Sequence, residues 1–174
     1  MTTLDASEFR EAMASFPSGV VVATTVDAAG RSWGFTASAF CSVSIEPPLV
    51  LLCLAKSADC HRAFTQAGHC AISVLHSGHR ELAMRFATKG ADKFAGYDFA
   101  ANAHGVPVLS GAHVGLDCTP HAVYDVGDHS VLIARVQGVV TAGVPRAGRS
   151  PIVYYQREFH PIAAACRRPS RGSC

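Results

Sequence analysis

Residues 34–57 read GFTASAFCSVSIEPPLVLLCLAKS, and this stretch decides the fold. Its first half is rich in small and hydroxyl side chains. Its second half opens with Pro47 and Pro48 and continues as a wholly apolar run over residues 49–54. A short apolar run bounded by turn residues is typical of a buried β-strand. Because proline has no N–H to donate to a neighbouring strand, we expect the two prolines to form a rigid turn in front of this strand.

On both sides of this stretch the chain is mostly patterned as strands joined by short turns. The segments are rich in β-branched residues, and tight turns are expected at residues 28–30 and 126–128. The expected strands cover residues 19–27, 31–40, 49–54, 70–75, 115–126, 129–143 and 151–159. Hairpins rather than crossover helices connect them, so the sheet is expected to be antiparallel.

Three short helices are expected beside the strands. Asp5 or Ser7 caps the first helix and Pro17 ends it, whereas Ser57 caps the second and Gly68 ends it. The expected helices cover residues 9–16, 57–66 and 78–88. The pattern therefore predicts a mainly β fold, an antiparallel barrel with a few short peripheral helices.

The composition fits one compact domain. Of the 174 residues, 49% are hydrophobic and 16% are charged, which is too apolar for a disordered chain and rather apolar for a monomer of this size. We therefore expect part of the apolar surface to lie in a subunit interface. The domain is expected to cover residues 1–163, and residues 164–174 are expected to be a disordered tail.

Charge and cysteine content limit the partners and the compartment. The net charge is +2, and basic residues are scattered except for Arg167, Arg168 and Arg171, so no nucleic-acid partner is expected. No signal peptide and no apolar run long enough for a membrane span is present, and we expect a cytoplasmic protein without membrane contact. The 7 cysteines contain no C-x-x-C pair and lie mostly in apolar runs, which favours reduced, buried thiols.

Common catalytic motifs are missing from the sequence. It has no G-x-G-x-x-G fingerprint, no phosphate-binding loop, no G-x-S-x-G elbow and no H-E-x-x-H helix. His76 and His79 have no third ligand at a telling spacing, so no metal site is expected. Cys60 and His61 are neighbours on the expected helix and point in different directions, which favours a helix surface over a nucleophile–base pair. Any chemistry therefore depends on a bound cofactor.

Several segments together resemble the short-chain flavin reductase family, the reductase components of two-component flavin-dependent monooxygenases. The matching segments are FPSGV (16–20), residues 34–57, FATKGADKF (86–94), GDH (127–129) and YYQREF (154–159). The resemblance runs from about Phe9 to Pro161. It implies an FMN-binding split β-barrel, a homodimer with flavin near the subunit interface, and a monooxygenase partner that receives reduced flavin.

The resemblance also implies which residues form the site. It places FAD or FMN against Thr36, Ala37, Ser38, Ala39, Ser42, Val43, Ser44, Cys53, Leu54, Ala55, Lys56, Ser57, Phe86, Ala87, Lys93 and Phe94. It places NADH or NADPH against Ser18, His129, Tyr155 and Arg157, with His129 as the catalytic residue. Where relatives often carry a hydroxyl residue shortly after Ser57, this chain has Asp59-Cys60-His61, which puts the phosphate contacts there in doubt.

The residues suit such a ligand on physical grounds. A flavin needs a flat apolar slot, hydrogen-bond donors for its ring and cationic or amide groups for its phosphate. Residues 36–39 are small and include two hydroxyls, and Lys56 and Ser57 stand where the apolar strand leads into the expected helix. Helix amides at that point would also favour a phosphate.

Two functions are compatible with such a pocket. One is hydride transfer from a nicotinamide to flavin, which needs two rings held face to face and no acid–base pair. The alternative is a non-catalytic split-barrel flavin or haem carrier or sensor, which would not need Gly127-Asp128-His129 or the Tyr155 and Arg157 pair. A purely oligomeric scaffold would leave Lys56 and Lys93 unexplained. The sequence favours the enzyme and does not choose between FAD and FMN or between NADH and NADPH.

Overall fold

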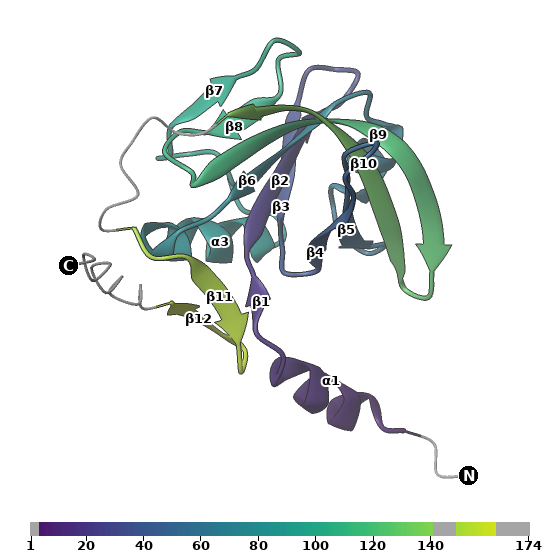
Figure 1. The fold of residues 1–174 in the computed structure, drawn as a ribbon, viewed down its shortest axis with the longest axis vertical. Coiled ribbons are helices and arrows are strands. Elements are labelled where there is room, and N and C mark those ends of the chain that lie inside the picture. The colour runs from purple at the N-terminus through teal and green to yellow at the C-terminus, as the bar shows by residue number, and fades with distance from the viewer. Residues whose placement is uncertain (1–3, 141–148, 163–174) are drawn as a thin grey trace, which may run out of the picture.

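The structure is a computed structural model that describes residues 4–140 and 149–162. The helices are α1 (Ala6–Ala14), α2 (His61–Gln66), the 3₁₀ helix η1 (Ser77–His79) and α3 (Arg80–Ala87). The strands are β1 (Ser18–Gly19), β2 (Val21–Val26), β3 (Ser32–Ala37), β4 (Phe40–Ser44), β5 (Leu49–Ala55), β6 (Cys70–Val74), β7 (Phe99–Ala101), β8 (Pro107–Leu109), β9 (Val114–Val126), β10 (His129–Val140), β11 (Ile152–Tyr155) and β12 (Glu158–Pro161). Figure 1 shows the strands as a curled sheet with short helices at its periphery.

The main sheet has seven antiparallel strands in the order β3-β2-β6-β9-β10-β5-β4. The two edge strands, β3 and β4, are joined in the chain by residues 38–39 alone. A two-residue link cannot span an open sheet, so the sheet curls until its two edges meet. The predicted fold class, a mainly β antiparallel split barrel with a few short peripheral helices, is confirmed. The edge strands β3 and β4 are not paired with each other, and we call the place where residues 38–39 link them the opening of the barrel.

Two apolar cores lie on opposite faces of the sheet, and β2 contributes to both. Val21 belongs to the cluster inside the barrel, whereas Val22 faces outward to the cluster under α3. Successive strand residues point to opposite faces, so a strand covered on both sides reads as a continuous apolar run. Phe86 of α3 is 1% exposed and fills the outer core. This packing fixes α3, and the chain that follows it, beside β3.

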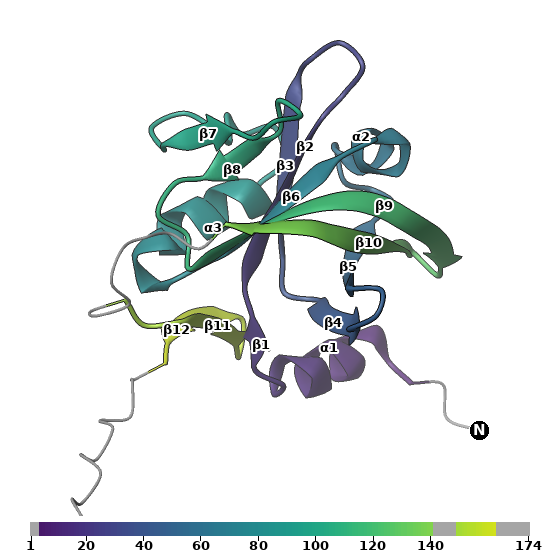
Figure 2. The same cartoon turned by 45° about the horizontal axis from the view of Figure 1, so that its top comes forward.

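The long β9–β10 hairpin and helix α1 extend from the barrel. The hairpin turns at Gly127, whose φ of +57° suits glycine. In Figures 1 and 2, α1 lies at one end of the barrel and is reached through β1, next to the β11–β12 hairpin. Glu11 of α1 accepts a hydrogen bond from Arg157 at 2.9 Å, and the Gln156 N–H donates to the Ala14 carbonyl at 2.8 Å.

Three sequence predictions of secondary structure are wrong. The expected strand 31–40 is interrupted after Ala37, where the chain crosses between the two sheet edges. The expected strand 151–159 is the hairpin of β11 and β12, which turns on Gln156 and Arg157 with φ of 48° and 65°. The expected helix 57–66 begins only at His61, as described below.

Other predictions fall partly outside the described residues. β10 ends at Val140, and residues 141–143 of its expected range are not described. The expected tail, residues 164–174, lies outside the described residues, as do Arg167, Arg168 and Arg171. Cys60, Cys70 and Cys118 are buried as expected, whereas Cys41 is exposed. Within residues 4–140 and 149–162, no helix is long and apolar enough to span a bilayer.

Candidate active site

A cavity of about 330 Å³ lies at the opening of the barrel, and we call it the central cavity. The ends of β3 and β5 form two of its walls, and the turn after β5 and the loop after α3 form the others. It is lined by Phe35, Thr36, Ala37, Ser38, Ala39, Cys53, Leu54, Ala55, Ser57, Ala58, Asp59, Cys60, Phe86, Ala87, Lys89, Lys93 and His129. The structure thus brings together most of the residues that the sequence assigns to flavin, from segments far apart in the chain.

Small residues at the sheet edges shape one wall of the central cavity. Ala37 ends β3, and the carbonyl of Ala39 accepts a hydrogen bond of 3.1 Å from the Cys53 N–H of β5. The hydroxyl of Thr36 donates to the Ala83 carbonyl of α3 at 2.6 Å, so its proton is already committed. The Ser38 hydroxyl has no partner among the described residues. Of the two hydroxyl donors expected from residues 36–39, only Ser38 remains available to a ligand.

Two lysines line one end of the central cavity. Lys89 donates to the Ser57 carbonyl at 2.7 Å, and Lys93 donates to the Gly34 carbonyl at 2.9 Å. An ammonium group has three N–H donors, so each lysine keeps donors for an anionic ligand. Asp59 accepts a hydrogen bond of 3.2 Å from the Gly90 N–H and thereby holds the loop that carries both lysines. Asp59, which departs from the family pattern, is thus a loop anchor beside the cations.

Lys56 does not line the central cavity, whereas Ser57 does, and the helix expected to begin at Ser57 begins at His61. Residues 57–60 are tight turns, in which the Ala58 N–H donates to Ala55 and the His61 N–H donates to Ala58, both at 3.0 Å. The Ala58 and His61 amides are therefore used within the chain, and no helix N-terminus forms at Ser57. The Lys56 ammonium lies 3.7 Å from Asp125 of β9 and does not line the central cavity. Lys89 was missed, although it stands in the quoted segment 86–94.

His129 begins β10 and lines the same cavity from the opposite side. Its Nδ1 lies 2.7 Å from Oδ1 of Asp128, and its side chain is 44% exposed. Hydrogen bonding from His129 lowers the pKa of Asp128 below its usual value, so the carboxylate is ionised and orients the ring. Nε2 has no partner among the described residues and is free to contact a ligand.

A second cavity, of about 440 Å³, adjoins the central cavity on the side of α1. We call it the α1 cavity. It is lined by Phe9, Arg10, Met13, Ala14, Phe16, Ser18, Ser38, Ala39, Tyr154 and Arg157. Ser18 and Arg157, which the sequence assigns to the nicotinamide nucleotide, therefore lie together here. Because Ser38 and Ala39 line both cavities, the two adjoin at these residues, and we call them together the groove.

Some predicted residues lie elsewhere. Tyr155 does not line the α1 cavity, and its ring centroid lies 6.1 Å from that of His160. Tyr154 lines the cavity instead, because adjacent strand residues face opposite sides of the sheet. Phe94 lines a neighbouring cavity instead of the central one. Ser42, Val43 and Ser44 lie on β4 outside the central cavity.

Cys60 and His61 are sequence neighbours but are not hydrogen-bonded to each other in the structure. Burial raises the pKa of the Cys60 thiol, so it is protonated at neutral pH, and His61 Nε2 instead lies 3.0 Å from the Ser130 hydroxyl. The rings of His76 and His79 lie 3.7 Å apart. Among the described residues, no group of three or more His, Cys, Asp or Glu side chains is arranged to hold a metal ion.

Comparison with known proteins identifies the family. Residues 13–163 match the family model described as flavin reductase like domain. The chain belongs to the flavin reductase-like family. It is 47% identical over 161 residues to an actinorhodin polyketide dimerase from Streptomyces coelicolor, with 92% of this chain and 89% of the relative covered. It is 43% identical over 153 residues to an NADH:riboflavin 5′-phosphate oxidoreductase from Streptomyces pristinaespiralis, covering 87% and 85%.

A solved structure of the flavin reductase-like family agrees with the fold. An NADH:FAD oxidoreductase from Streptomyces globisporus, in complex with NAD and FAD fragments, superposes with a TM-score of 0.82 at 31% identity. The match covers 94% of this chain and 98% of that one. The predicted family and enzyme class are therefore confirmed: the protein is an oxidoreductase of the flavin reductase type.

The residues of the central cavity fit a flavin. Its small apolar walls suit a planar ring, the Ser38 hydroxyl supplies a donor, and Lys89 and Lys93 supply cations at one end for a phosphate. Its volume lies within the range of about 300–1,000 Å³ that is common for small-molecule sites. This donor set differs from the predicted one chiefly in the lysine that takes the place of Lys56.

Proposed function

We propose that this protein transfers a hydride from NADH or NADPH to FAD or FMN in the central cavity and releases the reduced flavin to a partner monooxygenase. One observation carries the proposal. The groove consists of two adjoining cavities, the central cavity with Lys89, Lys93 and His129 and the α1 cavity with Ser18 and Arg157. Such a groove accommodates two planar ligands side by side or stacked.

The chain's own residues position the two ligands. A bound flavin supplies N5 as the hydride acceptor. Lys89 and Lys93 bind its phosphate, Ser38 donates to its ring, and Ala37 keeps the wall thin enough for close approach. His129 offers Nε2 to the nicotinamide carboxamide, and Arg157 binds its phosphates from the α1 cavity. Catalysis then comes from orientation, which explains why the groove needs no general acid or base.

Release of reduced flavin to a monooxygenase is supported by the family and by the openness of the groove. Relatives include the reductase component of a flavin-dependent trigonelline monooxygenase from Acinetobacter baylyi and the reductase subunit of a flavin-dependent monooxygenase from Mycobacterium tuberculosis. In this chain the groove lies at the barrel opening, so a flavin enters and leaves without passing through the core. Flavin acts here as a substrate that is bound, reduced and released.

A homodimer is the second part of the proposal. Helix α1 buries none of its residues within one chain; Phe9 on the helix is 53% exposed, and Phe16, which follows the helix, is 70% exposed. Exposed apolar side chains of this size on a helix favour contact with another protein surface. Because Phe9 and Phe16 also line the α1 cavity, a second copy seated on α1 would complete the nicotinamide side of the groove.

One assay tests the activity directly. The purified protein is mixed with NADH or NADPH, and oxidation of the nicotinamide is followed with and without added FAD or FMN. Turnover that requires flavin supports the reductase. Tight flavin binding without NAD(P)H consumption would instead identify a carrier or sensor.

A further inference from the structure

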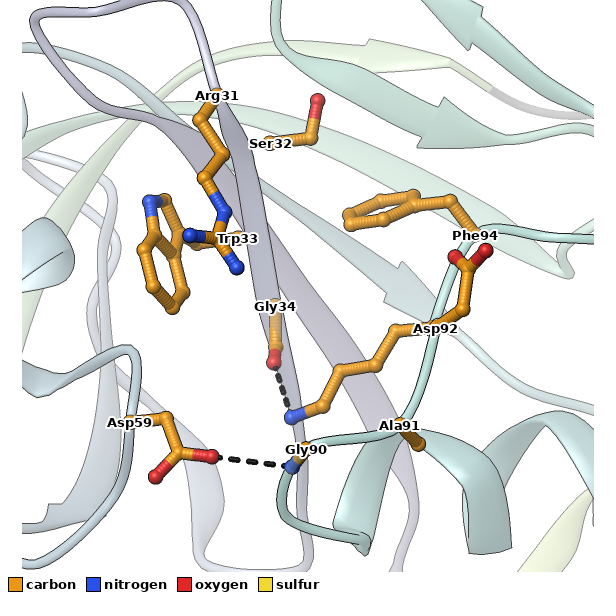
Figure 3. A pocket seen from close by; sticks show the side chains of 10 residues that line it. Arg31, Ser32, Trp33, Gly34, Asp59, Gly90, Ala91, Asp92 and Phe94 are labelled. Carbon is orange, nitrogen blue, oxygen red and sulfur yellow. Dashed lines mark hydrogen bonds between the residues drawn. The ribbon is translucent and has the colours of Figure 1, made fainter.

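A third cavity, of about 480 Å³, opens beside the cationic end of the central cavity. We call it the Trp33 cavity. It is lined by Arg31, Ser32, Trp33, Gly34, Asp59, Gly90, Ala91, Asp92, Lys93 and Phe94, which Figure 3 shows from close by. Asp59 and Lys93 line both this cavity and the central one, so the two adjoin at these residues.

The far wall of the Trp33 cavity is a flat cationic surface. The guanidinium of Arg31 lies 4.1 Å from the centroid of the Trp33 ring, in a cation–π stack. Asp27 holds this stack in place, since one of its oxygens accepts the Trp33 indole N–H at 2.8 Å and the other accepts the Arg31 backbone N–H at 3.0 Å. The stack is therefore preformed in the folded chain. Guanidinium planes and indole rings are the side chains on which nucleobases stack.

The cavity is separate from the nicotinamide side of the groove. Its lining shares no residue with the α1 cavity, which contains Ser18 and Arg157. It adjoins the groove at Lys93, one of the two lysines that we assign to the flavin phosphate. A ligand that enters it from the groove is therefore a continuation of the flavin beyond its phosphate.

We propose that the Trp33 cavity binds the adenylate half of FAD, with the adenine on the Arg31–Trp33 stack and the pyrophosphate at Lys93. This inference rests on the proposed function and extends it, because it makes FAD the preferred flavin. The phosphates of FMN and FAD carry similar charge, so the lysines serve both ligands. Only FAD has an adenosine to place against Arg31 and Trp33. The preference for FAD thus resides in the Arg31–Trp33 wall.

Equilibrium binding of FAD and of FMN, followed by quenching of flavin fluorescence or by calorimetry, tests the assignment. The wild-type protein is expected to bind FAD more tightly than FMN. Arg31→Ala removes an exposed side chain and leaves one face of the Trp33 ring uncovered. It is expected to weaken FAD binding by roughly three- to tenfold, while FMN binding stays within about twofold of wild type. Arg31→Lys keeps the charge and loses the flat surface, so its FAD affinity should lie between those of the wild type and Arg31→Ala. ADP alone should compete with FAD in the wild type and less in Arg31→Ala.

The control is Arg62→Ala, which removes an exposed arginine from α2 outside the Trp33 cavity and should change neither affinity. Equal affinity of the wild type for FAD and FMN, or an equal loss for both flavins in Arg31→Ala, would overturn the adenylate site. An Arg31→Ala protein with unchanged FAD affinity and a raised KM for NADH would assign the cavity to the nicotinamide nucleotide instead. A wild-type protein that binds neither flavin would refute the proposed function itself.

Discussion

At the scale of single residues, the smallness of Ala37 matters most for the flavin. Ala37 ends β3, is buried, and lines the central cavity. Ala37→Leu should weaken flavin binding by more than about tenfold, because overpacking a fitted wall commonly costs about 1–3 kcal/mol. Ala101→Leu, on the exposed strand β7 away from the groove, is the matched control. Thermal unfolding of both variants separates a lost site from a lost fold. Flavin affinity within about twofold of wild type, or about 0.4 kcal/mol, would show that the central cavity is not the ring site.

His129 carries the corresponding prediction for the nicotinamide nucleotide. Its Nδ1 is held by Asp128, and only Nε2 is free to contact the ligand. Loss of one neutral hydrogen bond costs about 0.5–1.5 kcal/mol, so His129→Ala should raise the KM for NAD(P)H or lower kcat by roughly three- to twelvefold. Steady-state kinetics with varied NAD(P)H and a separate flavin titration measure the two effects independently.

The flavin titration decides the role of His129, because this residue lines the central cavity together with the flavin residues. Flavin affinity should be almost unchanged in His129→Ala. Asp128→Asn keeps the imidazole and weakens its orientation, so it should produce a smaller change of the same kind. A His129→Ala protein that no longer binds flavin but keeps its nicotinamide kinetics would reverse the assignment of the two ligands.

At the scale of secondary-structure elements, the junction of β6, η1 and α3 makes stability depend on pH. Burial, followed by the nearby His76, lowers the pKa of His79 from 6.5 to about 4. The unfolded chain therefore binds a proton between pH 6.5 and pH 4 that the folded chain does not. Stability is full above pH 6.5 and falls as the pH decreases, by up to about 2 kcal/mol at pH 5 from this residue.

Urea unfolding at pH 7.5 and at pH 5 measures this effect. The midpoint should be lower at pH 5, and His79→Gln should reduce the difference between the two conditions. Part of the difference should remain in that variant, because burial also lowers the pKa of His76. A pH response identical in wild type and His79→Gln would show that other groups cause it.

The elements that the sequence predicts well are those with a strong local pattern. The range 49–54 reads as a strand because its apolar run is bounded by prolines, and β5 covers Leu49–Ala55. The turn at Gln156 and Arg157 has no Gly, Asn or Pro, so nothing local marks it. Its hydrogen bonds to α1 come from the far end of the chain, and no window of sequence contains them.

The candidate site also contains some residues that the sequence predicts and some that it does not. The contiguous wall at residues 36–39 was predictable, because a run of small and hydroxyl residues can be read from the sequence, although the end of β3 at Ala37 could not. The sequence analysis assigned Lys56 to the site and did not name Lys89, because only the tertiary fold decides which of the two lysines lines the cavity. The Lys56 ammonium lies near Asp125 of β9, a strand that is separated from β5 by β10. Lys89 instead donates a hydrogen bond to the Ser57 carbonyl in the turn after β5. Such choices depend on long-range register.

At the scale of the whole molecule, the groove is open on the side of α1. Phe9 and Met13 of α1, and Phe16 just after it, line the α1 cavity, and all three are exposed among the described residues. In Figure 2 the helix lies at one end of the barrel, so a partner seated on it would reach the α1 cavity that the helix lines. Assembly and nicotinamide binding are therefore expected to depend on the same surface.

Sedimentation velocity tests this dependence, and the wild type is expected at about twice the 18.3 kDa mass of the chain. The double variant Phe9→Ser, Phe16→Ser removes two exposed apolar side chains, one on α1 and one just after it, without taking any buried group from the barrel, and it should shift the protein to a monomer. Because α1 lines the nicotinamide side of the groove, the monomer should show a raised KM for NAD(P)H. Val139→Ser, at an exposed position near the end of β10, is the control and should leave the mass unchanged. A wild-type monomer that reduces flavin at the full rate would contradict the shared groove, because one chain would then form the whole site.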